Sequence, residues 1–209
     1  MILPIVAYGD SVLRKVGKEI PQDYKNLEAL VDDMFETMYA APGVGLAAPQ
    51  IGLDIRLFVV DSAHVLKKDG STPDIEEAPV DADDEEEDQF AGEVGIKKVF
   101  INAKIIKELG KTWPYNEGCL STPGIREDIQ RLDTIVIEYY DEKFNKYTEE
   151  YSGFTARVIQ HEYDHIQGIL FTDKLNPIKK RFLKNKLENI SKGFVDVKYK
   201  MKFPLKGRR

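Results

Sequence analysis

Two histidines lie four residues apart in the segment His161-Glu162-Tyr163-Asp164-His165. In an α-helix this spacing places two side chains about 40° apart on the same face, one turn apart, so both imidazoles could bind one cation. Glu162 projects roughly 60° from His165, which keeps a carboxylate beside the cation as a general base. The alternative is a chance match on a charged helix, but this helix is otherwise apolar and uncompensated His and Glu would be costly there. The pattern predicts a metal-dependent hydrolase.

A catalytic metal site needs three protein ligands and an open position, so a third ligand is expected. His64 is the only other histidine and lies beside an acidic stretch, as an ordinary polar residue. Glu188 follows the two histidines, but its lysine-rich setting indicates a solvated, charge-paired helix face. Cys119 is the better candidate, because the adjacent Gly118 lets backbone approach a ligand closely. The alternative for this thiol is a small buried hydrophobe.

The segment 43–50, Gly-Val-Gly-Leu-Ala-Ala-Pro-Gln, has side chains too small for an ordinary helix or strand. It has neither G-x-G-x-x-G nor the Lys-Ser/Thr ending of a phosphate-binding loop, so nucleotide binding is set aside. The segment offers exposed backbone and one amide side chain. The amide of Gln50 could donate to a developing oxyanion, or it could be bonded to its own loop.

These residues need elements to position them. Strand signals flank the helical ones without a regular β-α-β alternation, which favours an α+β fold with mostly antiparallel sheets packed around the central helix that carries HEYDH. That helix is predicted to start near 152 or 153 and to stop at Gly168. The other predicted elements are a helix over 23–39, strands at 57–60, 99–101, 134–140 and 146–151, a helix from 176–177 to 191, and a final strand over 195–203.

Length and composition, at 209 residues and 42% hydrophobic, favour a single catalytic domain, predicted over 1–193 with a basic strand or tail at 194–209. The stretch 69–93 holds twelve acidic residues and no Lys or Arg. The connection around it, at about 62–97, far exceeds the usual ~4 to 6 residues. We therefore expect a mobile, solvated insertion outside the core.

The basic C-terminal region 177–209 contains twelve Lys and Arg residues against two acidic ones. Such a charge balance could favour ribosomal RNA, although charge runs are usually just solvated. No run reaches the ~18 to 20 apolar residues of a membrane span, and no signal peptide is recognisable. With its single cysteine, the chain is expected to be cytoplasmic and not to bind a membrane.

Taken together, three segments resemble the signature motifs of the bacterial peptide deformylases, in the family's order. G-x-G-x-A-A-x-Q matches 43–50, E-G-C-x-S matches 117–121 and H-E-x-D-H matches 161–165, each without a substitution at its fixed positions. The similarity extends through the opening 1–5 and on to 175–177. The resemblance implies removal of the N-formyl group from the initiator methionine of newly made polypeptides, with release of formate.

The same resemblance implies that Cys119, His161 and His165 bind one divalent metal. The family typically uses Fe(II), and Zn, Ni or Co can occupy the site. Ligand softness alone would suggest zinc for this donor set. Glu162 would carry the proton, while Gln50 and the backbone N–H of Leu120 would meet the oxyanion.

Substrate backbone would run along Gly43 to Gly45 and Gly118, adding a strand-like edge pairing. The methionine side chain needs an apolar pocket beside the metal. Candidates for this pocket, which could equally be core residues, are Val44, Val158 and the stem of Arg157. Arg126 matches a family arginine near the peptide path.

Two other hypotheses about the function are compatible with the sequence. A zinc metallopeptidase would use His161, His165 and Glu188. A non-enzymatic binding module for nascent chains or ribosomes would carry a structural zinc, which requires four protein ligands, and the chain has no second cysteine. Oligomeric state, the metal bound in the cell and the role of the insertion are not determined by sequence, and Asp164 could orient a ligand or bind an arginine.

Overall fold

Five strands form one antiparallel sheet in the order β2-β3-β4-β5-β6 in the computed structural model, which describes residues 1–66, 90 and 92–205. The strands are β2 (Gly45–Ala47), β3 (Leu57–Asp61), β4 (Lys97–Gly118), β5 (Arg126–Tyr140) and β6 (Lys146–Ser152). A separate parallel pair joins β1 (Ile5–Val6) to β7 (Met201–Lys202). The helices are α1 (Leu27–Ala40), α2 (Gly153–Ile166) and α3 (Pro177–Lys192), with short 3-10 turns at Ser11–Arg14, Ala48–Ile51 and Phe171–Lys174. The predicted α+β class is confirmed.

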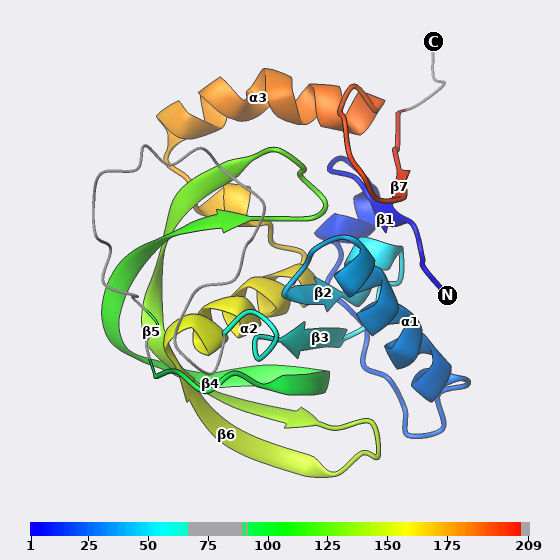
Figure 1. Cartoon of the computed structure of the whole chain (residues 1–209), viewed down its shortest axis with the longest axis vertical. Helices are drawn as coiled ribbons and strands as arrows, with labels where there is room; N and C mark the ends of the chain where they lie inside the picture. The colour runs from blue at the N-terminus through cyan, green and yellow to red at the C-terminus, as the bar shows by residue number, and fades with distance from the viewer. Residues whose placement is uncertain (67–89, 91, 206–209) are drawn as a thin grey trace.

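Helix α2 lies in the hollow of the curved sheet (Figure 1). The sheet has an apolar core on each of its two faces, and strand β3 contributes side chains to both. Phe58 and Val60 pack with the α2 side of the sheet, while Leu57 and Val59 pack with α1. Because successive strand residues point to opposite faces, one short apolar strand can fill both cores. Among the described residues, no helix is long and apolar enough to cross a membrane.

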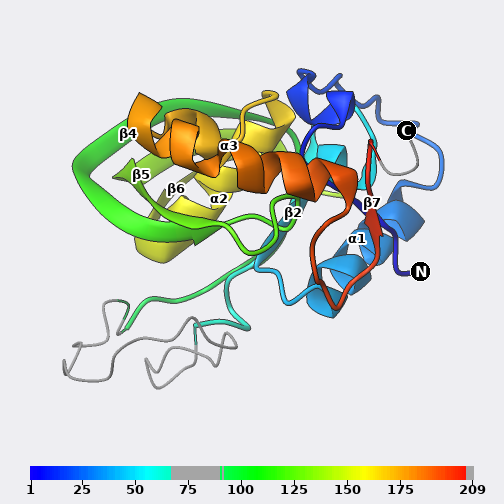
Figure 2. The ribbon, with the colours of Figure 1, turned by 90° about the horizontal axis from the view of Figure 1, so that it is seen from above.

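Helix α3 lies across the loop that joins β4 to β5 (Figure 2). Its Leu187 and Ile190 are buried against Ile125 and Ile129 of that loop and of β5, and Cys119 packs at the edge of the same cluster. Asn176 caps the helix by accepting the Lys179 N–H at 2.9 Å, as the sequence predicted. This packing supports the loop that carries the cysteine.

The N-terminus of α2 is held from outside the helix. Gly153 has a φ of 58°, and Ser152 makes no side-chain cap. Instead, a carboxylate oxygen of Glu93 accepts the Phe154 N–H at 2.9 Å. A carboxylate in this place satisfies a free helix donor and suits the helix dipole.

Glu93 belongs to the region predicted as a mobile insertion, most of which, at 67–89 and 91, lies outside the described residues. The described ends of that region correct the expectation that it stays out of the core. Val65 and Phe90 are buried, and the Phe90 ring lies 5.0 Å from that of Phe154. Apolar residues bordering an acidic run can thus belong to the core even though the run itself predicts solvation.

The predicted bounds of four elements were wrong. Helix α1 begins at Leu27, because Asn26 adopts a left-handed conformation that a helix cannot continue. Strands β4 and β5 are far longer than predicted, and they pair with each other over most of their length, with register shifts. Hydrogen bonds across this hairpin extend both strands into regions where the sequence shows little apolar alternation. The predicted strand over 195–203 is a paired strand only at Met201–Lys202, although its inward and outward alternation is present.

Candidate metal centre

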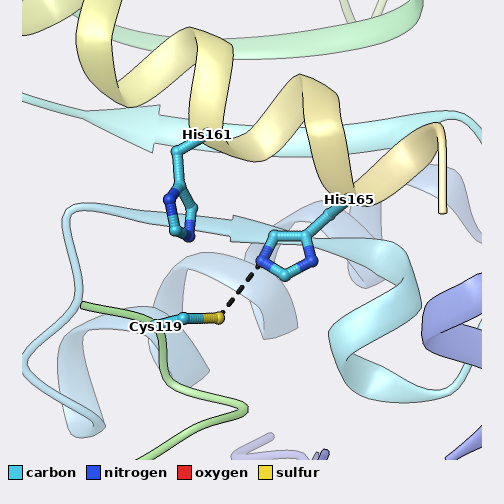
Figure 3. A group of neighbouring side chains, drawn as sticks. All are labelled: Cys119, His161 and His165. Atoms are coloured by element: carbon cyan, nitrogen blue, oxygen red, sulfur yellow. Dashed lines mark hydrogen bonds between the residues drawn. The ribbon is translucent and has the colours of Figure 1, made fainter. Parts of the chain in front are cut away.

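Three side chains converge between α2 and the segment after β4 (Figure 3). His161 and His165 project from successive turns of α2, and Cys119 follows Gly118, the last residue of β4. One ligand atom from each residue can be chosen so that all three lie within 4.8 Å of one another. The thiol sulfur is 3.2 Å from Nε2 of His165. The helical spacing predicted the histidine pair, and the fold brings the cysteine to it.

This donor set fits a single cation. Ligand atoms on a tetrahedral Zn²⁺, at bond lengths of about 2.0–2.3 Å, are separated by roughly 3.3–3.8 Å. The 3.2 Å between the Cys119 sulfur and Nε2 of His165 is close to that separation. One thiolate with two neutral imidazoles would leave a fourth position open. Burial, helped by the positive charge of Arg131, lowers the pKa of His165 well below its usual value, which keeps this imidazole in the neutral, metal-binding form.

Glu117 orients the first histidine. Its carboxylate lies 2.9 Å from Nδ1 of His161, so this nitrogen carries the proton and Nε2 is left to bind a cation. Arg131 donates to the same carboxylate at 2.7 and 3.0 Å, and Arg157 donates at 3.0 Å. Burial would raise the pKa of the Glu117 carboxyl, but hydrogen bonds from His161 and Arg131 hold it well below its usual range. Glu117 is therefore ionised at neutral pH, beside the three candidate metal ligands.

Asp164 takes part in the same buried network. Its carboxylate accepts from Arg131 at 2.7 Å and lies 3.1 Å from Lys174. Of the two roles left open by the sequence, binding an arginine is the one observed.

Glu162 lies between the metal-ligand cluster and β2. Burial raises the pKa of its carboxyl to about 7, although the charge of Arg131 opposes the shift. Its Oε2 atom is buried and has no hydrogen-bond partner in the described part of the chain. A Cβ on Gly45 would lie 2.6 Å from Oε1, so any larger residue at this position would displace the Glu162 carboxyl. A carboxyl with this pKa can take up and release a proton near neutral pH.

Gln50 is bonded to its own loop, which is one of the two roles considered for it. Its Oε1 accepts the Ala47 N–H at 2.8 Å, which ties the side chain to its own loop. Its Nε2 then points to the sulfur of Cys119 at 3.5 Å. The loop bond fixes the amide so that its donor end faces the metal-ligand cluster. Leu120, the residue after the cysteine, is held through its carbonyl by the hydroxyl of Tyr199 at 2.8 Å.

A cavity of about 530 Å³ lies beside these residues. Its wall includes Gln50, Cys119, His161 and Glu162. The predicted substrate-binding residues all lie in its wall: Val44, Gly45, Gly118, Arg126, Arg157 and Val158.

Two of these arginines have other partners. Arg157 is almost fully buried, and its guanidinium donates to Glu117 and to the carbonyls of Ile129 and Trp113, so only its stem is available to an apolar ligand. Arg126 is exposed and donates to Asn116. This geometry is compatible with the prediction that the stem of Arg157 lines an apolar pocket.

The sequence reasoning missed four residues of the site. Tyr115 and Phe154 line the cavity, and Glu117 and Arg131 form the buried ion pair behind His161. Helical spacing to Val158 could have indicated Phe154, and strand alternation with Glu117 could have indicated Tyr115. The partners of Glu117 lie 14 to 44 residues away in the chain, and no local pattern predicts them.

Glu188 does not reach the cluster. It is exposed on α3 and pairs with Lys192 one turn later, as its lysine-rich surroundings predicted. His64 is also distant from the ligands, with its ring against the carbonyl of Asp61. The set required by a His-His-Glu metallopeptidase is absent from the cluster that the described residues form.

The fold and the site define a metal-dependent hydrolase, with three candidate metal ligands and a buried carboxyl at one cavity. Comparison with known proteins identifies the family within this class of enzymes. The family described as polypeptide deformylase matches residues 2–181. The peptide deformylase of Christiangramia forsetii is 55% identical over 98% of this chain and 97% of its own length, and that of Flavobacterium psychrophilum is 55% identical over the full length of both chains.

Solved structures agree. Peptide deformylase 1B of Arabidopsis thaliana superimposes with a TM-score of 0.73 at 34% identity, covering 92% of each chain. A peptide deformylase from Legionella pneumophila gives 0.72 at 31% identity, covering 93% of this chain and 98% of its own. The chain belongs to the polypeptide deformylase family. It is a metal-dependent enzyme that removes the N-formyl group from newly made polypeptides.

Proposed function

We propose that Cys119, His161 and His165 are the metal ligands and that Fe(II) is the metal used in the cell, with Zn, Ni or Co as other occupants. The observation that carries this assignment is the convergence of one thiol and two imidazoles within 4.8 Å beside a buried carboxyl. A bound divalent cation supplies a Lewis acid that polarises the formyl oxygen and lowers the pKa of water from ~15.7 toward ~7.

Glu162 is the proton carrier of the reaction. Its buried carboxylate takes a proton from the attacking water and later returns it to the leaving amine. The carboxyl pKa of about 7 suits both transfers at neutral pH. The developing oxyanion is met by the Gln50 amide, which its bond to Ala47 holds in place, and by the backbone N–H of Leu120. Such donors contribute roughly 3 kcal/mol each to transition-state stabilisation elsewhere.

The peptide binds as an extra strand along β2, which is the edge strand of the sheet. Gly45 and Gly118 allow close backbone approach, and Arg126 lies at the rim. The methionine side chain enters the apolar part of the cavity, between Val44 and Val158. Tyr115, Phe154 and the stem of Arg157 complete this pocket.

The test is formate release by protein purified without oxygen. Formyl-Met-Ala-Ser should yield one formate per peptide, while the unformylated peptide yields none, and metal analysis should find one iron per chain. Samples reloaded with Ni, Co or Zn should regain activity to different extents. Absence of formate from Fe- or Ni-loaded protein would contradict the proposed ligand set, and full zinc occupancy in the native sample would contradict the choice of iron.

We further propose that the enzyme works in the cytoplasm and contacts the ribosome through its basic C-terminal region. Helix α3 exposes two apolar residues, Ile178 and Phe182, among lysines and an arginine. Basic side chains on this face would bind RNA phosphates in a salt-dependent manner. Reversing charge with Arg181→Glu and Lys184→Glu should reduce co-sedimentation with ribosomes about tenfold at low salt, without changing formate release from peptides. Binding that is insensitive to salt and to both substitutions would contradict this contact.

A further inference from the structure

The segment that follows α3 alternates inward and outward without forming a continuous strand. The inward side chains between 195 and 203 are half-buried, and the outward ones are exposed, apart from Pro204 beyond the alternation. Four of the five inward residues pack on a core cluster, but Val197 belongs to no core cluster of the described chain. It lines the catalytic cavity instead. The inward residues are Val195, Val197, Tyr199, Met201 and Phe203.

Val197 is held at the cavity from both sides of its chain, because Val195 packs on a core cluster and the chain after Val197 is hydrogen-bonded to neighbouring segments. The Tyr199 hydroxyl donates to the carbonyl of Leu120 at 2.8 Å, and Ile5 donates its N–H to the carbonyl of Lys200 at 2.9 Å. Beyond them, β7 pairs with β1, and Figure 1 shows the segment running from the end of α3 back to this pair. Residues 196–199 form one wall of the cavity, which we call the C-terminal wall.

The neighbours of Gly45 and Gly43 indicate the direction in which a bound peptide would run along the cavity. A Cβ on Gly45 would touch the Glu162 carboxylate, whereas a Cβ on Gly43 would lie 3.0 Å from the Leu120 side chain. Leu120 is the residue to which Tyr199 of the C-terminal wall is bonded. A peptide strand advances about 3.3 Å per residue. A formyl group beside Glu162 therefore places the second and third residues of the peptide near Gly43 and the C-terminal wall.

We propose that the C-terminal wall is a subsite of the enzyme, in which Val197 contacts an apolar side chain at the second or third position of the formylated peptide. The inference rests on the substrate path proposed above. The occupant is the substrate because the wall is continuous with the cavity that holds the metal-ligand cluster. Val197 then contributes to peptide affinity and to selectivity after the methionine, and takes no part in bond cleavage.

The test compares formyl-Met amide with formyl-Met-Ala-Leu. Val197→Ala removes two methyl groups from the wall, so the KM for the long peptide should rise about five- to tenfold relative to that for the short one, with kcat for the long peptide retained. Val197→Trp fills the subsite and should also raise the KM for the long peptide relative to that for the short one.

Val195→Ala is the matched control, because it removes the same atoms from the same face of the segment but packs on the core. It should lower the midpoint of urea unfolding and keep the wild-type ratio of KM values. If both Val197 variants keep the wild-type ratio, the subsite is wrong, while formate release by the wild type still upholds deformylation. If the wild type releases no formate from either substrate, the proposed catalytic assignment itself fails.

Discussion

Replacing Cys119 with alanine should remove the bound metal and lower formate release by about a thousandfold or more. Two imidazoles on adjacent turns of α2 would remain, and two neutral ligands neither complete a three-ligand site nor supply the negative charge of a thiolate. The packing cost should be modest, because Cys119 lies only at the edge of the cluster beneath α3. Metal content per chain, measured with formate release and far-UV circular dichroism, separates loss of the metal from loss of the fold.

Glu188→Ala is the control that distinguishes this site from a His-His-Glu metallopeptidase. Glu188 is exposed and paired with Lys192, so its removal should leave metal content and activity at the wild-type level. A Glu188 variant that loses its metal, together with a Cys119 variant that keeps it, would overturn the ligand assignment.

Glu162→Gln should reduce kcat by about 10² to 10⁴ while the metal content stays the same. Glutamine preserves the shape beside Gly45 but cannot accept a proton from water. Since the pKa of Glu162 is raised to about 7 by burial, the active carboxylate accumulates as pH rises toward that value. In the wild type, kcat/KM should therefore fall tenfold per pH unit on the acid side and level off above it. A bound cation favours the carboxylate and moves this limb to lower pH.

The acid limb should be missing from the residual activity of the Glu162 variant. Glu150→Gln, an exposed substitution of the same kind on β6, should keep both the rate and the limb. Loss of metal from Glu162→Gln would show that this carboxyl is a ligand, which contradicts its assignment as the proton carrier. An unchanged acid limb would place the titrating group elsewhere.

The sequence predicted most of what local patterns determine. The i, i+4 spacing located the histidines on a helix whose observed bounds agree with the prediction, and the glycine-rich segment indicated where backbone and substrate approach each other. Strand β4 was recognised only at its buried start. From Lys104 onward it is largely exposed, so apolar alternation does not reveal it.

The buried ion network could not be read from the sequence. Glu117 was visible as part of a motif, but its role depends on Arg131 of β5 and on Arg157 and His161 of α2, two stretches distant from it in the chain. A carboxylate with this many donors is a consequence of tertiary packing. Phe90 was missed for a related reason, because its acidic surroundings indicate solvent while its ring packs on Phe154.

The pairing of β1 with β7 affects the order in which the enzyme assembles. Cys119 and His165 are separated by 46 residues, whereas the β1–β7 ladder joins Ile5 to Met201, almost the full length of the chain. Closing the longer loop costs more entropy, and a nascent chain can form that contact only after the intervening residues have been synthesised. The ligand cluster can therefore form before the C-terminal wall, so a folding intermediate could gather its metal ligands before it can discriminate among long peptides.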